Sequence, residues 1–441
     1  MKKIPLFVAL AFSPQLFAAT DLLQVYKEAQ TQDATFQAAK SAQIAGQEKL
    51  PQARALFMPS VNLSANTTQN ETDTQTRGSS TLSSGERTYN SHGYSVSLNQ
   101  PLYRAQNYAS YAQAKSTVEQ VNAQYATAEQ DLVVRVAQAY FDVLLAQYNV
   151  TLAQAQQESI GEQLAQAKRN FEVGTATITD THDAQARFDL TLSQEIAAQN
   201  DLEIKRRSLQ QIINRQPDEL VTVRGEVPLV SPEPNNMDAW VEKALAQNPE
   251  TQIAKAAFDI ASEEVRKARG GHLPTLDLVA TYGDTVQGGG SGYDQNGKTI
   301  GLQMNLPIFA GGATSSKVRE AVANQEKARQ ELDAVQRKVA LQARQAYLGV
   351  TSGIAQVKAL QQAVISNQSS LDSTKLGLEV GVRTSVDLLN ARQQLFSARR
   401  DLAQALYGYI VSRLKLEAAA GDLNEADVSQ VNGWLNQAAK P

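Results

Sequence analysis

Two long runs of helix-forming residues limit what this chain can fold into. Residues 104–173 and 313–380 consist mainly of Ala, Gln, Leu, Glu and Lys, and neither run contains a proline. These residue types favour the α-helix, whereas an average helix in a globular protein has only about 11 residues. At about 1.5 Å per residue, a helix of roughly 70 residues is about 100 Å long. Helices of that length cannot form a compact globule.

The composition of these runs leaves two arrangements open. Small Ala and polar Gln recur on most faces, so neither run has a broad apolar stripe. A solvated coiled coil fits this pattern, and so does a helical wall that packs against neighbours on both flanks and faces water. The helical runs alone do not distinguish the two arrangements.

The segments that separate the helical runs alternate between apolar and polar residues. A period of two indicates β-strands with one apolar and one polar face. Val279 is an exception to the alternation. We expect four strands arranged as two hairpins, over residues 60–102 and 274–308. The alternating segments are residues 61–66, 94–99, 276–283 and 300–308.

Long polar loops and prolines mark the ends of these strands. Residues 70–92 and 287–298 contain no core-forming side chains, and they are longer than the two to five residues of ordinary hairpin loops. A proline has no N–H to donate to a strand ladder, so we expect it where strand gives way to helix. The prolines at these transitions are Pro59, Pro101, Pro274 and Pro307.

Short amphipathic strands with long polar loops are typical of outer-membrane β-barrels. Four strands cannot close a barrel, and open sheet edges are not tolerated in lipid. The chain must therefore oligomerise if its strands lie in a membrane. Two copies would give eight strands and three would give twelve. The polar inner faces favour the larger barrel, which can leave an open lumen.

Residues 1–19 have the layout of a secretory signal peptide, with Lys2 and Lys3 ahead of a short apolar run that ends in small residues. The sequence has no cysteine, three histidines and a net charge of −4. No motif indicates a metal site, a cofactor or a nucleophile. The near-neutral charge gives no sign of a nucleic-acid partner. We therefore expect a protein that is not an enzyme.

The pattern E-V-G-x-x-T-x-x-D occurs twice, at Glu172–Asp180 and Glu379–Asp387. Other pairs of similar stretches occur in the same order in the first and the second half of the chain, which indicates an internal two-fold repeat. We place the repeats at residues 20–236 and 237–433, followed by a C-terminal tail at 434–441. Each repeat is expected to contain a helix, a hairpin, a long helix, the E-V-G turn and another helix.

The repeated pattern predicts a tight reversal between two antiparallel helices. Its glycine suits the left-handed residue that ends one helix. Its threonine suits the N-cap of the next helix, and the acid three residues later resembles a capping box. These residues are Gly174, Thr177 and Asp180 in the first copy and Gly381, Thr384 and Asp387 in the second.

Four motifs stand in a fixed order along the chain, at residues 171–189, 248–250, 305–312 and 379–396. In this order they resemble the motifs of the TolC family of outer-membrane channel-tunnels, and the resemblance covers essentially the whole mature chain. The resemblance implies a homotrimer with a twelve-stranded barrel in the outer-membrane lipid and a long α-helical barrel that extends into the periplasm. It also implies a passive exit duct for type I protein secretion or multidrug efflux. A periplasmic adaptor and an inner-membrane ABC or proton-driven transporter would open the helical tip.

The resemblance also implies roles for residues of the two turns. Arg383 and Asp180 occupy the places of a polar link that holds the periplasmic mouth closed. Leu378 stands where some family members have a tyrosine that shares this acid. Asp387 matches an inward-facing aspartate at the pore constriction. Asn390 lies one helical turn deeper, where relatives can carry a second aspartate, so we expect a weaker preference for cations than two acidic rings would give.

A protein of another class would use the same helices differently. A trimeric coiled-coil fibre in the periplasm or on the cell surface would have a purely structural role and no channel activity. The alternating strands discriminate between the two functions, because strands inserted in a membrane predict ion conductance and a fibre predicts none.

Overall fold

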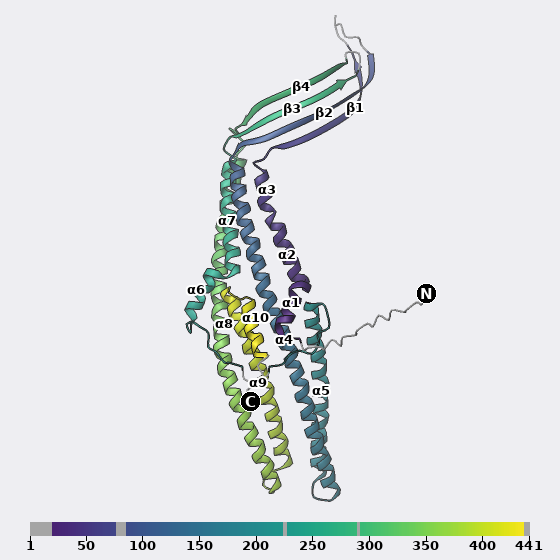
Figure 1. The fold of residues 1–441 in the computed structure, drawn as a ribbon, viewed down its shortest axis with the longest axis vertical. Helices are drawn as coiled ribbons and strands as arrows, with labels where there is room; N and C mark the ends of the chain where they lie inside the picture. The colour runs from purple at the N-terminus through teal and green to yellow at the C-terminus, as the bar shows by residue number, and fades with distance from the viewer. Residues whose placement is uncertain (1–19, 76–84, 224–226, 289–291, 436–441) are drawn as a thin grey trace, which may run out of the picture. The chain divides into compact units, whose positions relative to one another are not determined.

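A computed structural model describes residues 20–75, 85–223, 227–288 and 292–435 (Figure 1). The predicted signal peptide and the last six residues of the predicted tail lie outside the described residues. The helices are α1 (Leu22–Gln32), α2 (Ala34–Gln47), α3 (Lys49–Ala55), α4 (Ala105–Glu172), α5 (Ile178–Ile213), α6 (Met237–Gln247), α7 (Pro249–Gly270), α8 (Ala313–Glu379), α9 (Ser385–Ala420) and α10 (Glu425–Leu435). The strands are β1 (Ser60–Thr74), β2 (Gly85–Arg104), β3 (Thr275–Gln287) and β4 (Tyr293–Asn305).

The chain divides into two compact units, which we describe separately. The sheet unit comprises residues 41–125 and 250–336. The turn unit comprises residues 1–40, 126–249 and 337–441. The long helices α4 and α8 begin in the sheet unit and end in the turn unit.

The four strands form one antiparallel sheet in the order β1-β2-β3-β4, so the two predicted hairpins lie side by side (Figure 1). Residues paired directly across strands share a face of the sheet. One face therefore carries the predicted apolar residues, and the other carries mostly Ser, Thr, Asn and Gly, with Val279 as the expected exception. The apolar face includes Val61, Leu63, Val96, Leu98, Leu278, Ala280, Ile300 and Leu302.

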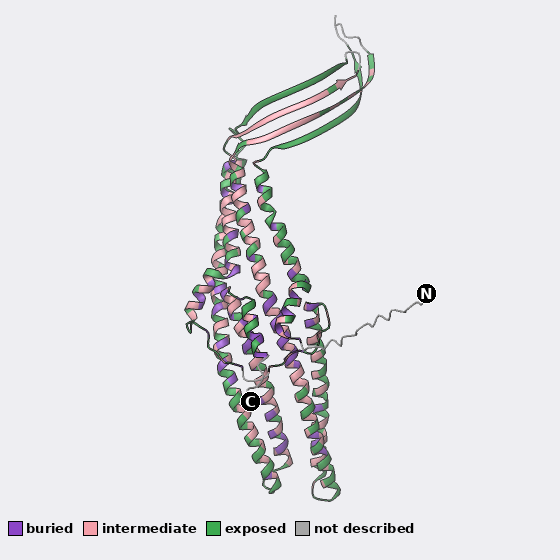
Figure 2. Ribbon diagram, viewed as in Figure 1, coloured by how far each residue is buried: buried purple, intermediate pink, exposed green. Residues whose placement is uncertain are grey.

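Figure 2 shows that β1 and β4, the two edge strands, are exposed, while β3 and most of β2 are half-buried. The apolar side chains on the edge strands are among the most exposed in the protein, with Leu63 at 72% and Ile300 at 77%. An edge strand with open N–H and C=O groups and exposed apolar side chains requires another partner. In one chain, both edges of the sheet are open.

The strands extend beyond the predicted alternation. β1 continues to Thr74 and β4 starts at Tyr293, so the ladder runs into the segments predicted as loops. Most side chains on both faces are polar there, so the hydrogen-bonded ladder has no alternating apolar pattern to reveal it. At the other end, Pro101 lies inside β2 at an irregularity in the pairing, and the strand continues to Arg104.

The two longest helices follow the sequence prediction closely. α4 and α8 begin and end within one residue of the predicted runs. The single helix expected before the first hairpin is instead three helices, with breaks after α1 and after α2. The first break falls at Asp33, whose backbone is extended and whose side chain is buried. The Asp33 carboxylate bonds Arg135, which is distant in the chain, and sequence periodicity does not reveal such a contact.

Two buried tyrosines fix the segment that connects α5 to α6 in the turn unit. The Tyr140 hydroxyl on α4 donates to the carbonyl oxygen of Val221 at 2.8 Å. The Tyr409 hydroxyl on α9 accepts from the N–H of Val230 at 3.0 Å. Both rings are almost fully buried. The connecting segment is therefore anchored on the long helices by hydrogen bonds that replace water.

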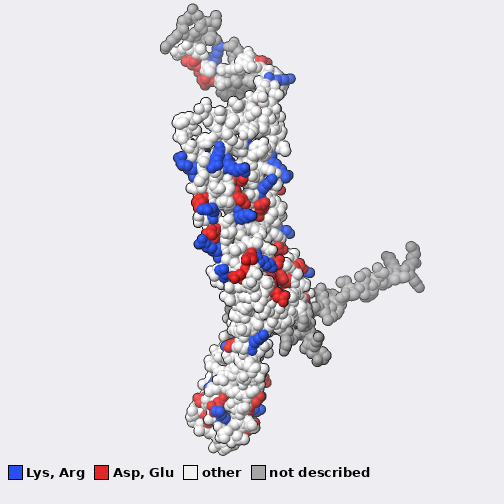
Figure 3. Space-filling model, turned by 90° about the vertical axis from the view of Figure 1, so that its left-hand side faces the viewer, with Lys and Arg blue, Asp and Glu red and all other residues white. Residues whose placement is uncertain are grey.

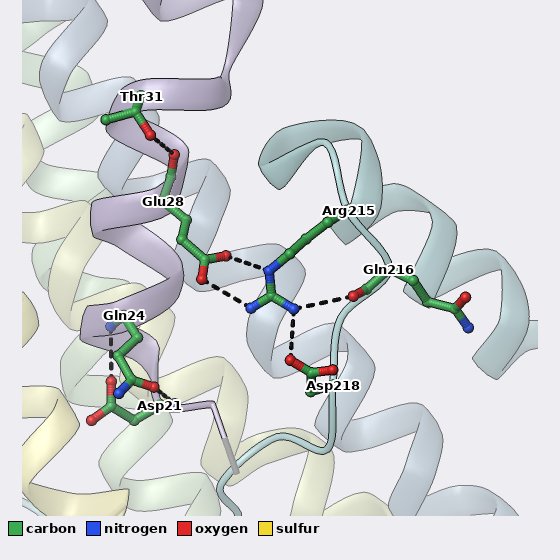
Figure 4. Close-up of polar contacts among 7 residues, drawn as sticks. All are labelled: Asp21, Gln24, Glu28, Thr31, Arg215, Gln216 and Asp218. Carbon is green, nitrogen blue, oxygen red and sulfur yellow. Dashed lines mark hydrogen bonds and ion pairs between the residues drawn. The ribbon is translucent and has the colours of Figure 1, made fainter. Parts of the chain in front are cut away.

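Arg215 joins the end of α5 to α1 in the same unit (Figure 4). Its Nε and one terminal nitrogen donate to the two carboxylate oxygens of Glu28, both at 2.9 Å. The other terminal nitrogen donates to Asp218 at 2.7 Å. A bidentate arginine–carboxylate pair fixes orientation as well as distance. The short helix α1 is thereby held beside the C-terminal end of α5.

Candidate functional site

The two E-V-G turns have the same backbone geometry. α4 ends at Glu172 and α8 ends at Glu379, and the glycine that follows each is left-handed, with φ of 75° at Gly174 and 79° at Gly381. After each glycine, a backbone N–H returns 2.8 Å to a carbonyl oxygen of the last helical turn. Only glycine adopts this conformation at little cost, so it stops both helices at equivalent points.

The threonine and the acid of each turn cap the next helix reciprocally. Thr384 Oγ1 accepts from the N–H of Asp387 at 3.2 Å, and the Asp387 carboxylate accepts from the N–H and the hydroxyl of Thr384, both at 2.9 Å. Thr177 and Asp180 make the same three bonds, in the same order, at 3.2, 3.0 and 2.8 Å. Both acids therefore have a structural partner within their own turn.

The capping bonds influence the charge of Asp387. The bond from the backbone of Thr384, followed by that from its hydroxyl, holds the pKa of the Asp387 carboxyl below its usual range, and nearby Arg383 adds to the effect. The side chain remains partly accessible to solvent. Asp387 therefore carries a negative charge at neutral and mildly acidic pH.

The structure does not pair Arg383 with Asp180 within one chain. Arg383 folds back on the last turn of α8, where a Cβ added at Gly377 would lie 2.7 Å from its Cγ. Leu378, which stands where some family members have a tyrosine that shares this acid, lines a groove together with Asp180. The predicted link is thus left open within a single subunit.

This groove lies between the helical hairpin α4–α5 and the hairpin α8–α9, and its volume is about 360 Å³. Its wall combines apolar leucines with acidic and basic side chains. The charged side chains are Glu162, Asp180, Asp183, Lys375, Glu379 and Arg392. On the face shown in Figure 3, side chains of both signs also gather around the turns at the lower end of the view.

Two arginines that the sequence did not single out connect the two hairpins. Arg187 on α5 donates to Asn390 on α9 at 2.9 Å and to Gln393 at 3.4 Å. Arg392 on α9 donates to the hydroxyl and the carbonyl oxygen of Ser159 on α4. The sequence offers one signal for these contacts. When the two repeats are aligned at their E-V-G turns, Arg187 matches Gln394 and Arg392 matches Gln185, so neither arginine has a basic counterpart in the other repeat.

The site has none of the features of a metal centre. Within the described ranges, no group of three or more His, Asp or Glu side chains is placed to hold a metal ion. In the same part of the chain, no helix is both long and apolar enough to cross a membrane. The site consists of the two E-V-G turns at the ends of the long helices and of the polar contacts between the two helical hairpins.

The long helices, the amphipathic sheet with open edges and the paired turns define a class of outer-membrane channel subunits. The family model described as "Outer membrane efflux protein" matches residues 25–215 and 240–422, and the chain belongs to this family. It is therefore an outer-membrane protein of the Gram-negative type.

Three known proteins illustrate the likeness. The chain is 35% identical to outer membrane protein TolC of Vibrio cholerae, covering 100% of both chains. It is 35% identical to the alkaline protease secretion protein AprF of Pseudomonas aeruginosa, covering 94% of this chain and 87% of that one. The fold matches the crystal structure of the CmeC outer membrane channel of Campylobacter jejuni with a TM-score of 0.78 and 18% identity, covering 100% of this chain and 98% of that one.

Proposed function

We propose that three copies of this chain form the outer-membrane exit duct of an export system. The observation that carries the proposal is the four-stranded sheet, which separates an apolar from a polar face and leaves β1 and β4 unpaired. Pairing β4 of one copy with β1 of the next would close twelve strands and satisfy every edge in lipid. The polar face would then line a lumen that continues between the long helices.

The names of the relatives support the kind of export system. AprF is named for secretion of an alkaline protease and the family for efflux, so we place this chain in type I protein secretion, multidrug efflux or both. The duct itself is passive and performs no chemical reaction. A periplasmic adaptor and an inner-membrane transporter, either an ABC or a proton-driven pump, supply the energy and open the turns.

We also propose that the two halves, 20–236 and 237–433, are structural repeats. Each half contains a helix that ends at a buried polar residue, Asp33 or Asn248. The helices α2 and α3 in the first half, and the single helix α7 in the second, then lead to a hairpin. Each half then continues through a long helix and an E-V-G turn to a 36-residue helix.

The turns are the proposed gate. In a trimer, the three Asp387 carboxylates would form an acidic ring at the constriction, backed by a ring of Asn390 amides. Because Arg383 and Asp180 are not paired within one chain, we place their link between neighbouring subunits. An outward pull on the helices would break three such links together.

Ion conductance in planar lipid bilayers tests the channel. Purified wild-type protein should conduct and favour cations, because an acidic ring attracts them. Arg383→Ser should increase the open fraction severalfold, because each exposed link contributes about 0.2–1 kcal/mol and three are lost at once. Asp387→Ala should conduct with a reduced cation preference.

Each part of the proposal can fail by itself. If neither the wild type nor Arg383→Ser conducts, the channel is excluded and the structural fibre remains. If the Asp387→Ala channel kept the wild-type ion preference, the assignment of Asp387 to the pore constriction would be wrong. If the Arg383→Ser channel had the same open fraction as the wild type, only the proposed link between Arg383 and Asp180 would be excluded.

A further inference from the structure

Arg187 reaches from one helical hairpin to the other and contacts only neutral groups there. Its two terminal nitrogens donate to the side-chain oxygens of Asn390, at 2.9 Å, and Gln393, at 3.4 Å. Within the described residues, no carboxylate lies within ion-pair distance of this guanidinium. The amide contacts orient the positive charge of Arg187 without neutralising it.

This charge lies close to the predicted constriction. Asn390 follows Asp387 by three residues on α9, and side chains at this spacing are neighbours on a helix surface, with Cβ atoms about 5–6 Å apart. A guanidinium bonded to Asn390 is therefore within about 10 Å of the Asp387 carboxylate. That separation is no greater than the Debye length of about 10 Å in 0.1 M salt, so both charges act on the same passing ion.

We propose that Arg187 is a selectivity-determining residue of the pore mouth. This inference rests on the proposed function. Three copies bring three Arg187 cations beside three Asp387 carboxylates, and the opposing charges reduce the preference for cations. Asn390 is part of this arrangement because its neutral amide positions the Arg187 guanidinium and leaves its charge intact. A carboxylate at position 390 would instead form an ion pair with Arg187 and cancel the charge.

The reversal potential in a KCl gradient measures this effect. Arg187→Gln should raise the ratio of K⁺ to Cl⁻ permeability by about two- to fivefold, as expected for three unit charges about 10 Å from the ion path in screened water. Arg187→Lys keeps the charge and should stay close to the wild-type ratio. This pair separates the charge of the residue from its hydrogen bonds.

A second arginine on the same helix provides the matched control. Arg207 is 20 residues further along α5, about 30 Å away along the axis, and pairs with Glu203. Arg207→Gln removes the same charge per chain and should leave the permeability ratio unchanged. A conducting Arg187→Gln channel with the wild-type ratio would overturn the inference, and so would an equal shift in the Arg207→Gln channel.

The contact itself can be tested without conductance. The chain has no cysteine, so Arg187→Cys combined with Asn390→Cys gives the full-length protein one defined thiol pair. A short bismaleimide should link the two thiols within one chain, with Arg207→Cys combined with Asn390→Cys as the unlinked control. Failure to link the first pair would overturn the inference through its geometry. If the two thiols were cross-linked efficiently but none of the variants conducted ions in bilayers, the result would instead count against the channel.

Discussion

Replacing Gly421 by alanine should destabilise the folded protein by about 2–4 kcal/mol. Gly421 ends α9 in the left-handed region, with φ of 84° and ψ of 13°, and its N–H returns to the carbonyl of Ala418. A side chain in this conformation costs about 1 kcal/mol or more. The measurement is the unfolding transition of the purified protein in detergent, followed by circular dichroism.

Lack of space adds to this conformational cost. A Cβ at Gly421 would lie 2.7 Å from the Cα of Asn248 and 2.7 Å from the carbonyl oxygen of Gln247. Both neighbours are backbone atoms, and Asn248 is further held by its bond to the carbonyl of Ala419 at 2.9 Å. Overpacking of this kind typically costs about 1–3 kcal/mol, because a backbone cannot move aside as a flexible side chain can.

Two other glycines on the same helical hairpin separate these contributions. Gly381 is left-handed, but a Cβ there would meet no atom within 4 Å, so Gly381→Ala should cost only about 1 kcal/mol. Gly408 lies inside α9 with open space, and Gly408→Ala should stabilise the helix by up to about 1 kcal/mol. If all three variants unfolded alike, the packing of Gly421 against Asn248 would be refuted.

The features that the sequence predicted are those determined by local interactions. Helix propensity and the absence of proline locate α4 and α8, because every residue contributes to the same helical period. Alternation locates the strands where one face is apolar, and it fails near Thr74 and Tyr293, where most side chains on both faces are polar. The E-V-G turns depend on contacts among neighbouring residues, so their capping residues can be named from sequence alone.

The features that the sequence missed depend on residues far apart in the chain. Asp33, at the break between α1 and α2, bonds Arg135 about a hundred residues away, and the segment between α5 and α6 is bonded by Tyr140 and Tyr409. The arginine contacts at the turns follow the same rule. Arg187 and Asn390 are 203 residues apart, and no local pattern indicates that an arginine on one hairpin meets an amide on the other.

Replacing Asp33 by alanine should destabilise the protein by about 2–3 kcal/mol. The Asp33 side chain is only 5% exposed, and its carboxylate accepts two bonds from the Arg135 guanidinium, at 3.0 and 3.2 Å. It also accepts from the N–H of Phe36 at 2.7 Å, which caps α2. Losing the cap costs about 1 kcal/mol, and breaking a buried pair costs more. The cost stays moderate because Arg135 keeps its second partner, Asp131.

Acid should remove the same stabilisation from the wild type. Burial alone would raise the pKa of Asp33, but the bonds from Arg135 and Phe36 outweigh burial and lower it. A carboxyl with a lowered pKa stabilises the folded state above its unfolded pKa, about 3.9 for Asp, and the stabilisation is lost as pH falls through the lower folded value. The difference in stability between the wild type and Asp33→Ala should therefore be constant from pH 7 to about pH 5 and shrink below pH 4.

Two substitutions distinguish this pair from a general effect of acid. Asp131→Ala removes the exposed partner of the same arginine and should cost less than about 1 kcal/mol, because an exposed pair at a helical i, i+4 spacing contributes little. Asp33→Asn keeps an oxygen that can cap α2 but cannot ionise, so its loss should be smaller than that of Asp33→Ala. Equal losses in Asp131→Ala and Asp33→Ala would show that neither the burial of the Asp33 carboxylate nor its cap on α2 determines its contribution, because both acids pair with Arg135 and Asp131 has neither feature.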